Sequence, residues 1–360
     1  MKKKTVAVVF GGKSPEHEVS VESAKTICAG LAGAGFSVLA FNAPRSGAWR
    51  LVRVSDLLSG RRLAGPEIEP SLGGSCFVKK GGGRLRPDVL FPIIHGSTGE
   101  DGVLQGLLEL AGIPYAGCGV TASAVCMDKI ISKELAALDG APVLPHILVR
   151  EHQKALMAPL LARAARLGFP LFVKPVAQGS SVGVSKVQRR TELLPAVLNA
   201  FRFDNAVIIE KGVDRAREIV CGVLGSAGGA KASVTGEVVP RGKHEFYDYE
   251  AKYLDDDGMD FVLPARLSTA VSRRLRDLAV KIFLALGCSG MARVDFLVDP
   301  KDEGKVYFCE INTLPGFTSH SLYPRLWEKT GLKPEKVLRE LVVLGLAAAA
   351  QKRRLSTARK

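Results

Sequence analysis

The start of the chain alternates strand, helix and strand patterns, and this alternation constrains the fold more than any other feature. Residues 5–10 form a short apolar run that ends at Gly11 and Gly12. A helical pattern with one apolar face covers about residues 17–34, and residues 36–41 return to a strand pattern. Such strand–helix–strand units pair their strands in parallel. We therefore expect an N-terminal α/β domain with a doubly wound parallel sheet.

The rest of the chain changes character twice, which predicts three domains. Residues 44–86 are rich in Gly, Pro and Arg and suggest irregular excursions with short strands. We expect an N-terminal α/β domain over 1–122, a small central α+β domain over 123–211 and a C-terminal α+β domain over 212–360. The last contains a long connection, 241–262, before a helix and two strands.

Two segments near the C-terminal end of the chain, around residues 291–297 and 306–312, have strand patterns and carry charged residues. Because side chains alternate along a strand, Arg293 and Asp295 share one face of the first, and Glu310 and Asn312 share one face of the second. The other residues predicted on these faces are mostly apolar: Met291, Leu297, Val306 and Phe308. Charged groups on an apolar face are expensive unless they are paired or bind a metal.

Two carboxylates and an amide oxygen form an all-oxygen set that suits Mg²⁺, which often bridges protein carboxylates to phosphates. Arg293 beside this set can hold negative charge. The alternative is a structural ion pair between Arg293 and Asp295, with Glu310 on a solvated edge. The first interpretation predicts a protein that handles a Mg-nucleotide.

The central region offers phosphate ligands. Lys129 begins a helix and Lys174 precedes a proline at a strand end, and lysine is a natural phosphate ligand. Either one alone is also typical of a solvated surface. The segment 178–183 contains Ser180 and Ser181 between glycines, which lets backbone N–H groups and hydroxyls face an anion. A plain hairpin turn is the alternative there.

The glycines after the first strand do not form a Walker A loop, because that motif needs a glycine where the chain has Ala7. They lie instead at the carboxyl edge of the expected parallel sheet, where ligands bind. Glu16 opens the following helix. It is a candidate ligand residue, although an acidic residue in a first turn also stabilises the helix dipole.

The junction of the second and third regions carries further carboxylates, and domain junctions commonly hold nucleotides. Glu210 and Lys211 end one strand, and Glu218 lies on the next, where a carboxylate can accept from ribose hydroxyls. Residues 243–254 are aromatic and charged without Gly or Pro. A long loop with packing side chains is often functional, and we expect a lid that excludes water.

Charge and cysteine content exclude other classes of protein. The net charge of +14 includes three lysines at residues 2–4 and five basic residues in the tail 351–360. Without them the body carries +6, and no basic–aromatic motif typical of RNA-binding modules is present, so we expect no nucleic-acid partner. Seven cysteines without a Cys-x-x-Cys pair favour a reducing compartment. No segment approaches the length of a membrane span.

Taken together, the motifs resemble those of the D-alanine–D-alanine ligases of the ATP-grasp superfamily over roughly residues 4–350. The matching segments are Gly-Gly-Lys-Ser-Pro-Glu16-His-Glu-Val-Ser, His95-Gly-x-x-Gly-Glu100-Asp-Gly, Met127-Asp-Lys129, Val-Lys174-Pro-x-x-x-Gly-Ser180-Ser181-Val-Gly, Tyr-Asp-Tyr-Glu-Ala-Lys252-Tyr253 and Glu310-Ile-Asn312-Thr-Leu-Pro-Gly316-Phe-Thr-Ser-His-Ser321-Leu. The resemblance does not extend to the basic tail after about residue 350.

The resemblance implies an ATP-grasp fold and roles for matching residues. The residues that it assigns to ATP are Lys129 and Lys174 on the phosphates, Ser181 in the phosphate loop, Glu210 and Lys211 near adenine, Glu218 on the ribose, and Lys252. The residues that it assigns to two Mg²⁺ ions, or to Mn²⁺, are Asp295, Glu310 and Asn312. Those that it assigns to the amino acids are Glu16 on the first ammonium with His95 and Ser180 nearby, Arg293 and the Gly316 N–H as oxyanion hole, Ser321 on the second substrate, and Tyr253 in the lid.

The implied reaction joins two D-alanines through D-alanyl phosphate, with ATP converted to ADP and phosphate, for peptidoglycan precursors in the bacterial cytoplasm. The family is usually homodimeric. One rival is a D-alanine–D-lactate ligase on the same fold, which the Tyr253 of dipeptide-forming members disfavours. A nucleotide-binding protein without ligase activity and a nucleic-acid-binding protein are rivals from other classes.

Overall fold

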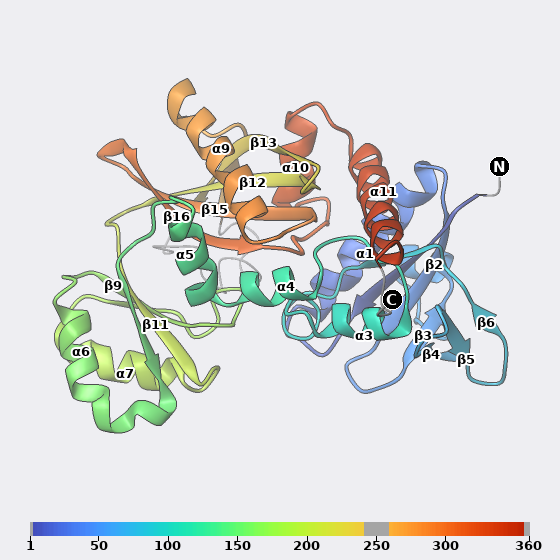
Figure 1. Cartoon of the computed structure of the whole chain (residues 1–360), viewed down its shortest axis with the longest axis horizontal. Helices are drawn as coiled ribbons and strands as arrows, with labels where there is room; N and C mark the ends of the chain where they lie inside the picture. Colours follow the sequence, from blue (N-terminus) through green and yellow to red (C-terminus); the bar gives the residue numbers. More distant parts are fainter. Residues whose placement is uncertain (1–2, 241–258, 356–360) are drawn as a thin grey trace.

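Three β-sheets build the described part of the chain, each in its own region of the sequence, as the computed structural model in Figure 1 shows. The structure describes residues 3–240 and 259–355. The expected lid, with Lys252 and Tyr253, falls almost wholly outside these residues. No helix within the described ranges has the length and apolar character needed to cross a membrane.

The N-terminal sheet has the strand order β6-β5-β4-β3-β2-β1-β7. Its strands are β1 (Thr5–Gly11), β2 (Ser37–Ala43), β3 (Trp49–Val52), β4 (Glu67–Ser71), β5 (Cys76–Lys79), β6 (Arg84–Leu85) and β7 (Val89–Pro92). Helix α1 (His17–Gly33) packs on one face, and α3 (Val103–Ala111) contributes to the core on the other. The predicted strand–helix–strand opening is therefore present, with β1 parallel to both β2 and β7.

The stretch 44–86 is more regular than expected. It forms β3 to β6 and the short helix α2 (Val54–Leu58), and its strands extend the sheet in antiparallel fashion. The ring of Phe77 lies 4.8 Å from that of Phe41 and stacks on Trp49. This aromatic contact places the extension in the same core as β1 and α3. Among the named strands of this sheet, parallel pairing joins β1 to β2 and to β7.

The central sheet has the order β10-β9-β11-β8, with every neighbouring pair antiparallel. Its strands are β8 (His146–Arg150), β9 (Leu171–Pro175), β10 (Ser185–Val187) and β11 (Ala206–Lys211). A 3₁₀ turn (Glu151–Leu156), α6 (Met157–Ala165) and α7 (Arg190–Ala200) complete this region, and the two helices cover one face of the sheet. Helix α5 (Lys129–Leu138) packs Ile130 on the other face.

The C-terminal sheet has the order β14-β13-β12-β15-β16 and is also antiparallel. Its strands are β12 (Arg217–Ser226), β13 (Gly229–Pro240), β14 (Met259–Val262), β15 (Gly290–Asp299) and β16 (Asp302–Asn312). Helix α9 (Thr269–Ala285) covers one face and α10 (Leu322–Lys329) packs on the other. Residues 259–262, expected in the long connection, thus form an edge strand.

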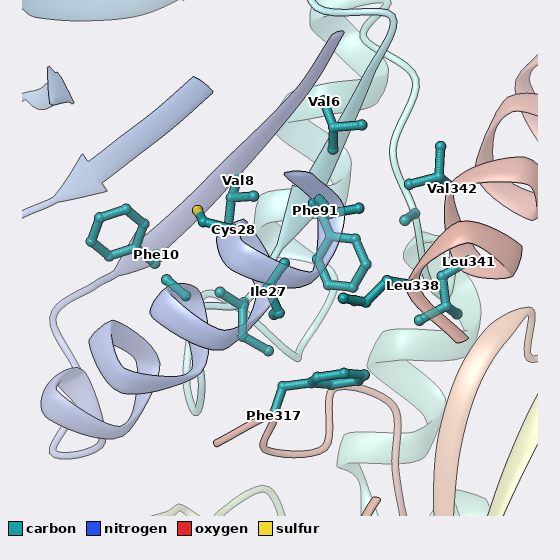
Figure 2. Packing of buried hydrophobic residues seen from close by; sticks show 14 of the residues in the cluster. Val6, Val8, Phe10, Ile27, Cys28, Phe91, Phe317, Leu338, Leu341 and Val342 are labelled. Atoms are coloured by element: carbon teal, nitrogen blue, oxygen red, sulfur yellow. The ribbon is translucent and has the colours of Figure 1, made fainter. Parts of the chain in front are cut away.

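One apolar core joins the first and third regions. Helix α11 (Pro334–Arg353) packs against α1, so that Leu338 and Leu341 reach the N-terminal core, and α4 (Val120–Met127) leads from that region towards α5. Figure 2 shows Phe317, from the loop after β16, pointing into the same cluster as Ile27 and Phe91. Burial of these side chains ties the loop to the N-terminal sheet.

Candidate functional site

Two cavities meet in the middle of the molecule. The large cavity has a volume of about 1090 Å³ and lies between the N-terminal and C-terminal sheets. The small cavity has a volume of about 570 Å³ and lies between the central and C-terminal sheets. Lys129, Gln178 and Glu310 line both, so they mark the point where the two cavities join.

The site residues that the sequence predicted, where they fall within the described ranges, line one or both of these cavities. Those that line the large cavity are Glu16, His95, Lys129, Ser180, Arg293, Glu310, Asn312, Gly316 and Ser321. Those that line the small cavity are Lys129, Lys174, Ser181, Glu210, Lys211, Glu218, Asp295 and Glu310. The fold therefore brings together residues that lie up to 305 positions apart in the sequence, from Glu16 to Ser321.

Strands β15 and β16 bring the acidic residues together in register. Asp295 is paired with Glu310, and Arg293 with Asn312, so both pairs face the cavities. The predicted alternation is wrong for part of β16, because Val306 and Phe308 are buried on the opposite side, against α9. A β-bulge between Phe308 and Glu310 inserts Cys309 and causes this shift. Such bulges re-aim side chains at active sites, here Glu310 towards the cavities.

Arg293 makes two hydrogen bonds to Asp295, at 2.8 and 2.6 Å. The ion pair that the sequence offered as an alternative is thus present within the candidate metal set. Each carboxylate oxygen has two acceptor sites, so Asp295 retains capacity for a cation. The same holds for Asn312 Oδ1, which accepts from the Leu314 N–H at 2.8 Å. The all-oxygen chemistry of Asp295, Glu310 and Asn312 fits Mg²⁺.

A buried ionic cluster closes the inner wall of the small cavity. Glu210 is 1% exposed, with Lys133 Nζ 2.7 Å and Lys174 Nζ 2.9 Å from its carboxylate oxygens. Burial alone would raise the pKa of Glu210, but the charges of the two lysines outweigh it and lower the pKa to about 2. Burial alone would lower the pKa of Lys174. The negative charge of Glu210 outweighs burial, so the pKa of Lys174 lies above its usual value.

Sequence reasoning missed Lys133. It lies four residues after Lys129, on the same face of α5, and that spacing of two lysines is the signal that was available. Its ammonium also donates to the Phe308 carbonyl at 3.1 Å. Lys133 therefore links the helix, the central sheet and β16 behind the cavity wall.

Lys129 is positioned by the start of its helix. Asp128 caps α5 by accepting from the Ile130 and Ile131 N–H groups, both at 2.9 Å. The Lys129 ammonium donates to the Gln178 carbonyl and lies 3.8 Å from Glu310 Oε2. Burial lowers the pKa of Lys129, against the opposing effect of Glu310.

The serine loop reaches the N-terminal domain. Ser180 Oγ donates to Glu16 Oε1 at 2.6 Å, and both serines have left-handed backbones, with φ of 51° at Ser180 and 56° at Ser181. This conformation costs about 1–2 kcal/mol for a residue with a side chain. Ser180 and Ser181 are the central residues of a turn between the antiparallel strands β9 and β10, closed by the Val182 N–H donating to the Gly179 carbonyl at 3.1 Å. The hairpin turn offered as an alternative is therefore present, and it lies at the wall of both cavities.

His95 and the loop after β16 form the far wall of the large cavity. His95 is 3% exposed, and its Nδ1 lies 3.4 Å from Glu100 Oε1. Burial is the main cause that raises the pKa of Glu100. Ser321 Oγ accepts from the Thr318 N–H at 2.9 Å, beside Gly316, where an added Cβ would lie 2.8 Å from this oxygen. Only glycine fits there without movement of Ser321.

The sequence profiles of two protein domains match this chain. The D-ala D-ala ligase N-terminus profile matches residues 5–118, and the D-ala D-ala ligase C-terminus profile matches residues 135–343. The chain belongs to the D-alanine–D-alanine ligase family. The mixed α/β architecture with three sheets is accordingly the ATP-grasp fold of these ligases.

Relatives in the D-alanine–D-alanine ligase family match over nearly the whole chain. A D-alanine–D-alanine ligase of Heliobacterium modesticaldum is 44% identical, covering 100% of this chain and 99% of the relative. The D-alanine–D-alanine ligase A of Escherichia coli K12 is 40% identical, covering 99% and 100%.

Solved structures agree with the family assignment. The D-alanine–D-alanine ligase of Coxiella burnetii is similar with a TM-score of 0.85 and 34% identity, over 98% of this chain and 97% of that one. The VanG D-Ala:D-Ser ligase of Enterococcus faecalis gives the same TM-score and identity, over 96% and 100%.

Proposed function

We propose that this protein joins two molecules of D-alanine into D-alanyl-D-alanine with conversion of ATP to ADP and phosphate. The observation that carries the proposal is the junction of the two cavities at Lys129 and Glu310. A nucleotide in the small cavity would present its terminal phosphate there, next to an amino acid in the large cavity. The family of the chain supports the same reaction.

The chemistry has two steps. The carboxylate of the first D-alanine attacks the γ-phosphorus of ATP, which forms D-alanyl phosphate and releases ADP. The amine of the second D-alanine then attacks the acyl carbon, loses a proton, and displaces inorganic phosphate. Little covalent chemistry is required of the protein in the first step, so positioning and electrostatic stabilisation dominate.

The residues of the large cavity take the amino acids. Glu16 pairs with the ammonium of the first D-alanine, supported by Ser180 and His95, which line the same space. Arg293 and the Gly316 N–H stabilise the oxyanion that forms on the acyl carbon. Ser321 orients the second D-alanine. The roles of Lys252 and Tyr253 stay predictions from the resemblance, because both residues lie outside the described ranges.

The residues of the small cavity take the nucleotide. Lys129 and Lys174 contact the phosphates with Ser181, while Glu210 and Lys211 flank the adenine and Glu218 binds the ribose. The buried pair of Lys174 with Glu210 supports a fixed position for that ammonium. We propose two Mg²⁺ ions, or Mn²⁺ in their place, held by Asp295, Glu310 and Asn312. When bound, they neutralise charge on the transferred phosphoryl group.

Compartment, assembly and domain boundaries are also proposals. All seven cysteines lack disulfide partners, which supports a reducing compartment such as the bacterial cytoplasm, where the product would enter peptidoglycan synthesis. A homodimer rests on the family resemblance and is testable by sedimentation. We propose the division at residues 122 and 211. The separate ranges of the three sheets support three regions, although residue 122 lies within helix α4.

An endpoint reaction with Mg-ATP and D-alanine, analysed by mass spectrometry, tests the proposed function. We expect D-alanyl-D-alanine with one ADP and one phosphate per bond, and no product from L-alanine. Equal D-lactate and D-serine are added in competition, since one relative is a D-Ala:D-Ser ligase. A mixed depsipeptide or a D-alanyl-D-serine product as the main species would move the proposal to that substrate. ATP binding without any product would leave only the nucleotide-binding alternative.

A further inference from the structure

A buried serine joins two walls of the large cavity. Ser23 lies on α1 and is 0% exposed. Its Oγ accepts a hydrogen bond from the Phe317 N–H at 3.1 Å and lies 3.3 Å from His95 Nε2. Phe317 directly follows Gly316, and both Gly316 and His95 line the large cavity. One hydroxyl therefore touches the backbone of one wall and the imidazole of the other.

The neighbours of His95 and Ser23 indicate which atoms carry the hydrogens in these contacts. His95 Nδ1 faces the Glu100 carboxylate at 3.4 Å, so a neutral imidazole with its hydrogen on Nδ1 leaves Nε2 as an acceptor. The Ser23 hydroxyl then donates to Nε2, while its oxygen accepts from the Phe317 N–H. Every polar group in this buried chain obtains a partner in that arrangement, as buried polar groups generally do.

The hydrogen bond from the Phe317 N–H to Ser23 orients the main chain at Phe317, which apolar packing of the ring does not do. The ring of Phe317 is held by Phe91 and Tyr323, with ring centres 6.5 and 5.8 Å away, and Figure 2 shows it inside the cluster. Ring packing has no directional demand on the main chain. The Phe317 N–H and the Gly316 carbonyl share one planar peptide, so the bond to Ser23 fixes the orientation of that peptide. The Gly316 N–H lies on the preceding peptide and is anchored by the fixed plane through the Gly316 Cα.

We propose that Ser23 is a positioning residue for the amide-forming step, because it holds the Gly316 backbone and the His95 ring in register across the acyl phosphate. The proposal rests on the proposed function. Ser23 lines neither cavity, so it acts on the substrates only through its two neighbours. ATP binds in the other cavity, which Ser23, His95 and Phe317 do not line.

The test compares Ser23→Ala with a matched control, Ser123→Ala. Ser123 lies on α4 and is also 0% exposed, but no polar atom of the described residues partners its hydroxyl, and it lines neither cavity. Both variants remove one buried oxygen from a helix. The measurements are kcat, KM for ATP, the urea midpoint, and the ratio of phosphate released to dipeptide formed.

For Ser23→Ala we expect kcat to fall by about tenfold to a hundredfold, the effect typical of a small misplacement at a reacting centre. KM for ATP should change by less than about twofold, since the contact acts in the other cavity. The ratio of phosphate to dipeptide should rise above one, because D-alanyl phosphate hydrolyses when amine attack slows. Ser123→Ala should keep the ratio of the parent protein.

A second variant guards against failure to fold. Ser23→Cys keeps nearly the same size with a much weaker hydrogen-bonding group, so the same rise in the ratio is expected. A ratio of one with unchanged kcat in Ser23→Ala or Ser23→Cys would overturn the proposal. So would an equal loss of kcat in Ser123→Ala, which would indicate a stability effect alone. If the parent protein itself makes no dipeptide, the proposed function fails first, which distinguishes the two results.

Discussion

Ser180 donates a hydrogen bond of 2.6 Å to Glu16, although 164 positions separate the two residues in the sequence. The bond connects the loop after β9 with the start of α1, and both residues line the large cavity. The bond fixes the position of the carboxylate, and each carboxylate oxygen has two acceptor sites. This geometry fits the role proposed for Glu16, which is to bind the ammonium of the first D-alanine.

We expect Glu16→Gln to raise the KM for the first D-alanine by about 30-fold, which corresponds to about 2 kcal/mol lost from a charge-assisted contact. The KM for ATP should stay within about twofold, because the ATP site that we propose is the small cavity. Initial rates with each substrate varied in turn give both values. Glu18→Gln is the control, since Glu18 lies at the same cavity but is largely exposed and paired with Arg45. An equal effect in both variants would indicate general attraction of cations rather than a specific contact.

The backbone conformation of Gly11, in the turn before Glu16, leads to a prediction about stability. Gly11 has φ of 96°, and a Cβ there would lie 2.3 Å from the Ala43 carbonyl oxygen on the neighbouring strand. Gly11→Ala combines this clash with a left-handed backbone, and we expect a loss of more than about 2 kcal/mol in the free energy of unfolding. Gly47→Ala, where an added Cβ meets no atom within 4 Å, is the matched control. Urea unfolding of both variants should show a large shift for the first alone.

The early elements of the fold were predictable because their signals are local. The apolar runs and the helical period between residues 5 and 41 depend on neighbours within a few positions, and the structure has the expected β1, α1 and β2. The bulge at Cys309 was not predictable, because it depends on how β16 pairs with β15. A strict alternation therefore assigned Val306 and Phe308 to the wrong face.

The candidate site was predictable to a similar extent. Charged residues in recognisable motifs, such as Glu16 and Glu310, could be selected from the sequence, since polar side chains on apolar faces require partners. Lys133 and Ser23 were not selected. Their importance comes from tertiary contacts, with Glu210 and with Phe317, and only their buried polar positions on amphipathic helices hint at it.

The buried ionic cluster predicts a dependence of stability on pH. The folded pKa of Glu210 is about 2, below the value of about 4.3 for an unfolded glutamate. Its stabilising contribution is thus complete above about pH 5 and is lost as pH falls towards 2. At pH 7 we expect Glu210→Gln to lose about 3 kcal/mol, because two buried lysines lose their carboxylate. The difference between parent and variant should shrink in urea titrations at progressively lower pH.

A surface glutamate provides the comparison for this experiment. Glu192 pairs with Arg189 at the start of α7 where solvent screens the pair, so Glu192→Gln should change stability far less at any pH. A Glu210→Gln variant whose deficit stays constant between pH 7 and pH 3 would contradict the assigned cause. Lys133 and Lys174 would then be stabilised by groups other than this carboxylate.

The bulge that turns Glu310 towards the cavities leads to a prediction about the metal. If Glu310 is a ligand of the proposed Mg²⁺ ions, Glu310→Gln should raise the Mg²⁺ concentration for half-maximal activity by at least about tenfold, since a charged oxygen ligand is lost. Titration of Mn²⁺ by electron paramagnetic resonance, with a non-hydrolysable ATP analogue present, should show the same weakening without turnover.

Glu303→Gln is the control for Glu310→Gln. It lies on the same strand, pairs with Arg217 at 2.8 Å, and lines neither cavity. Glu310 lines the small cavity together with Asp295, whereas Glu303 lies outside it. Unchanged Mn²⁺ affinity in Glu310→Gln, or equal weakening in Glu303→Gln, would remove Glu310 from the ligand set. The bulge would then serve only to place Phe308 in the core beneath α9.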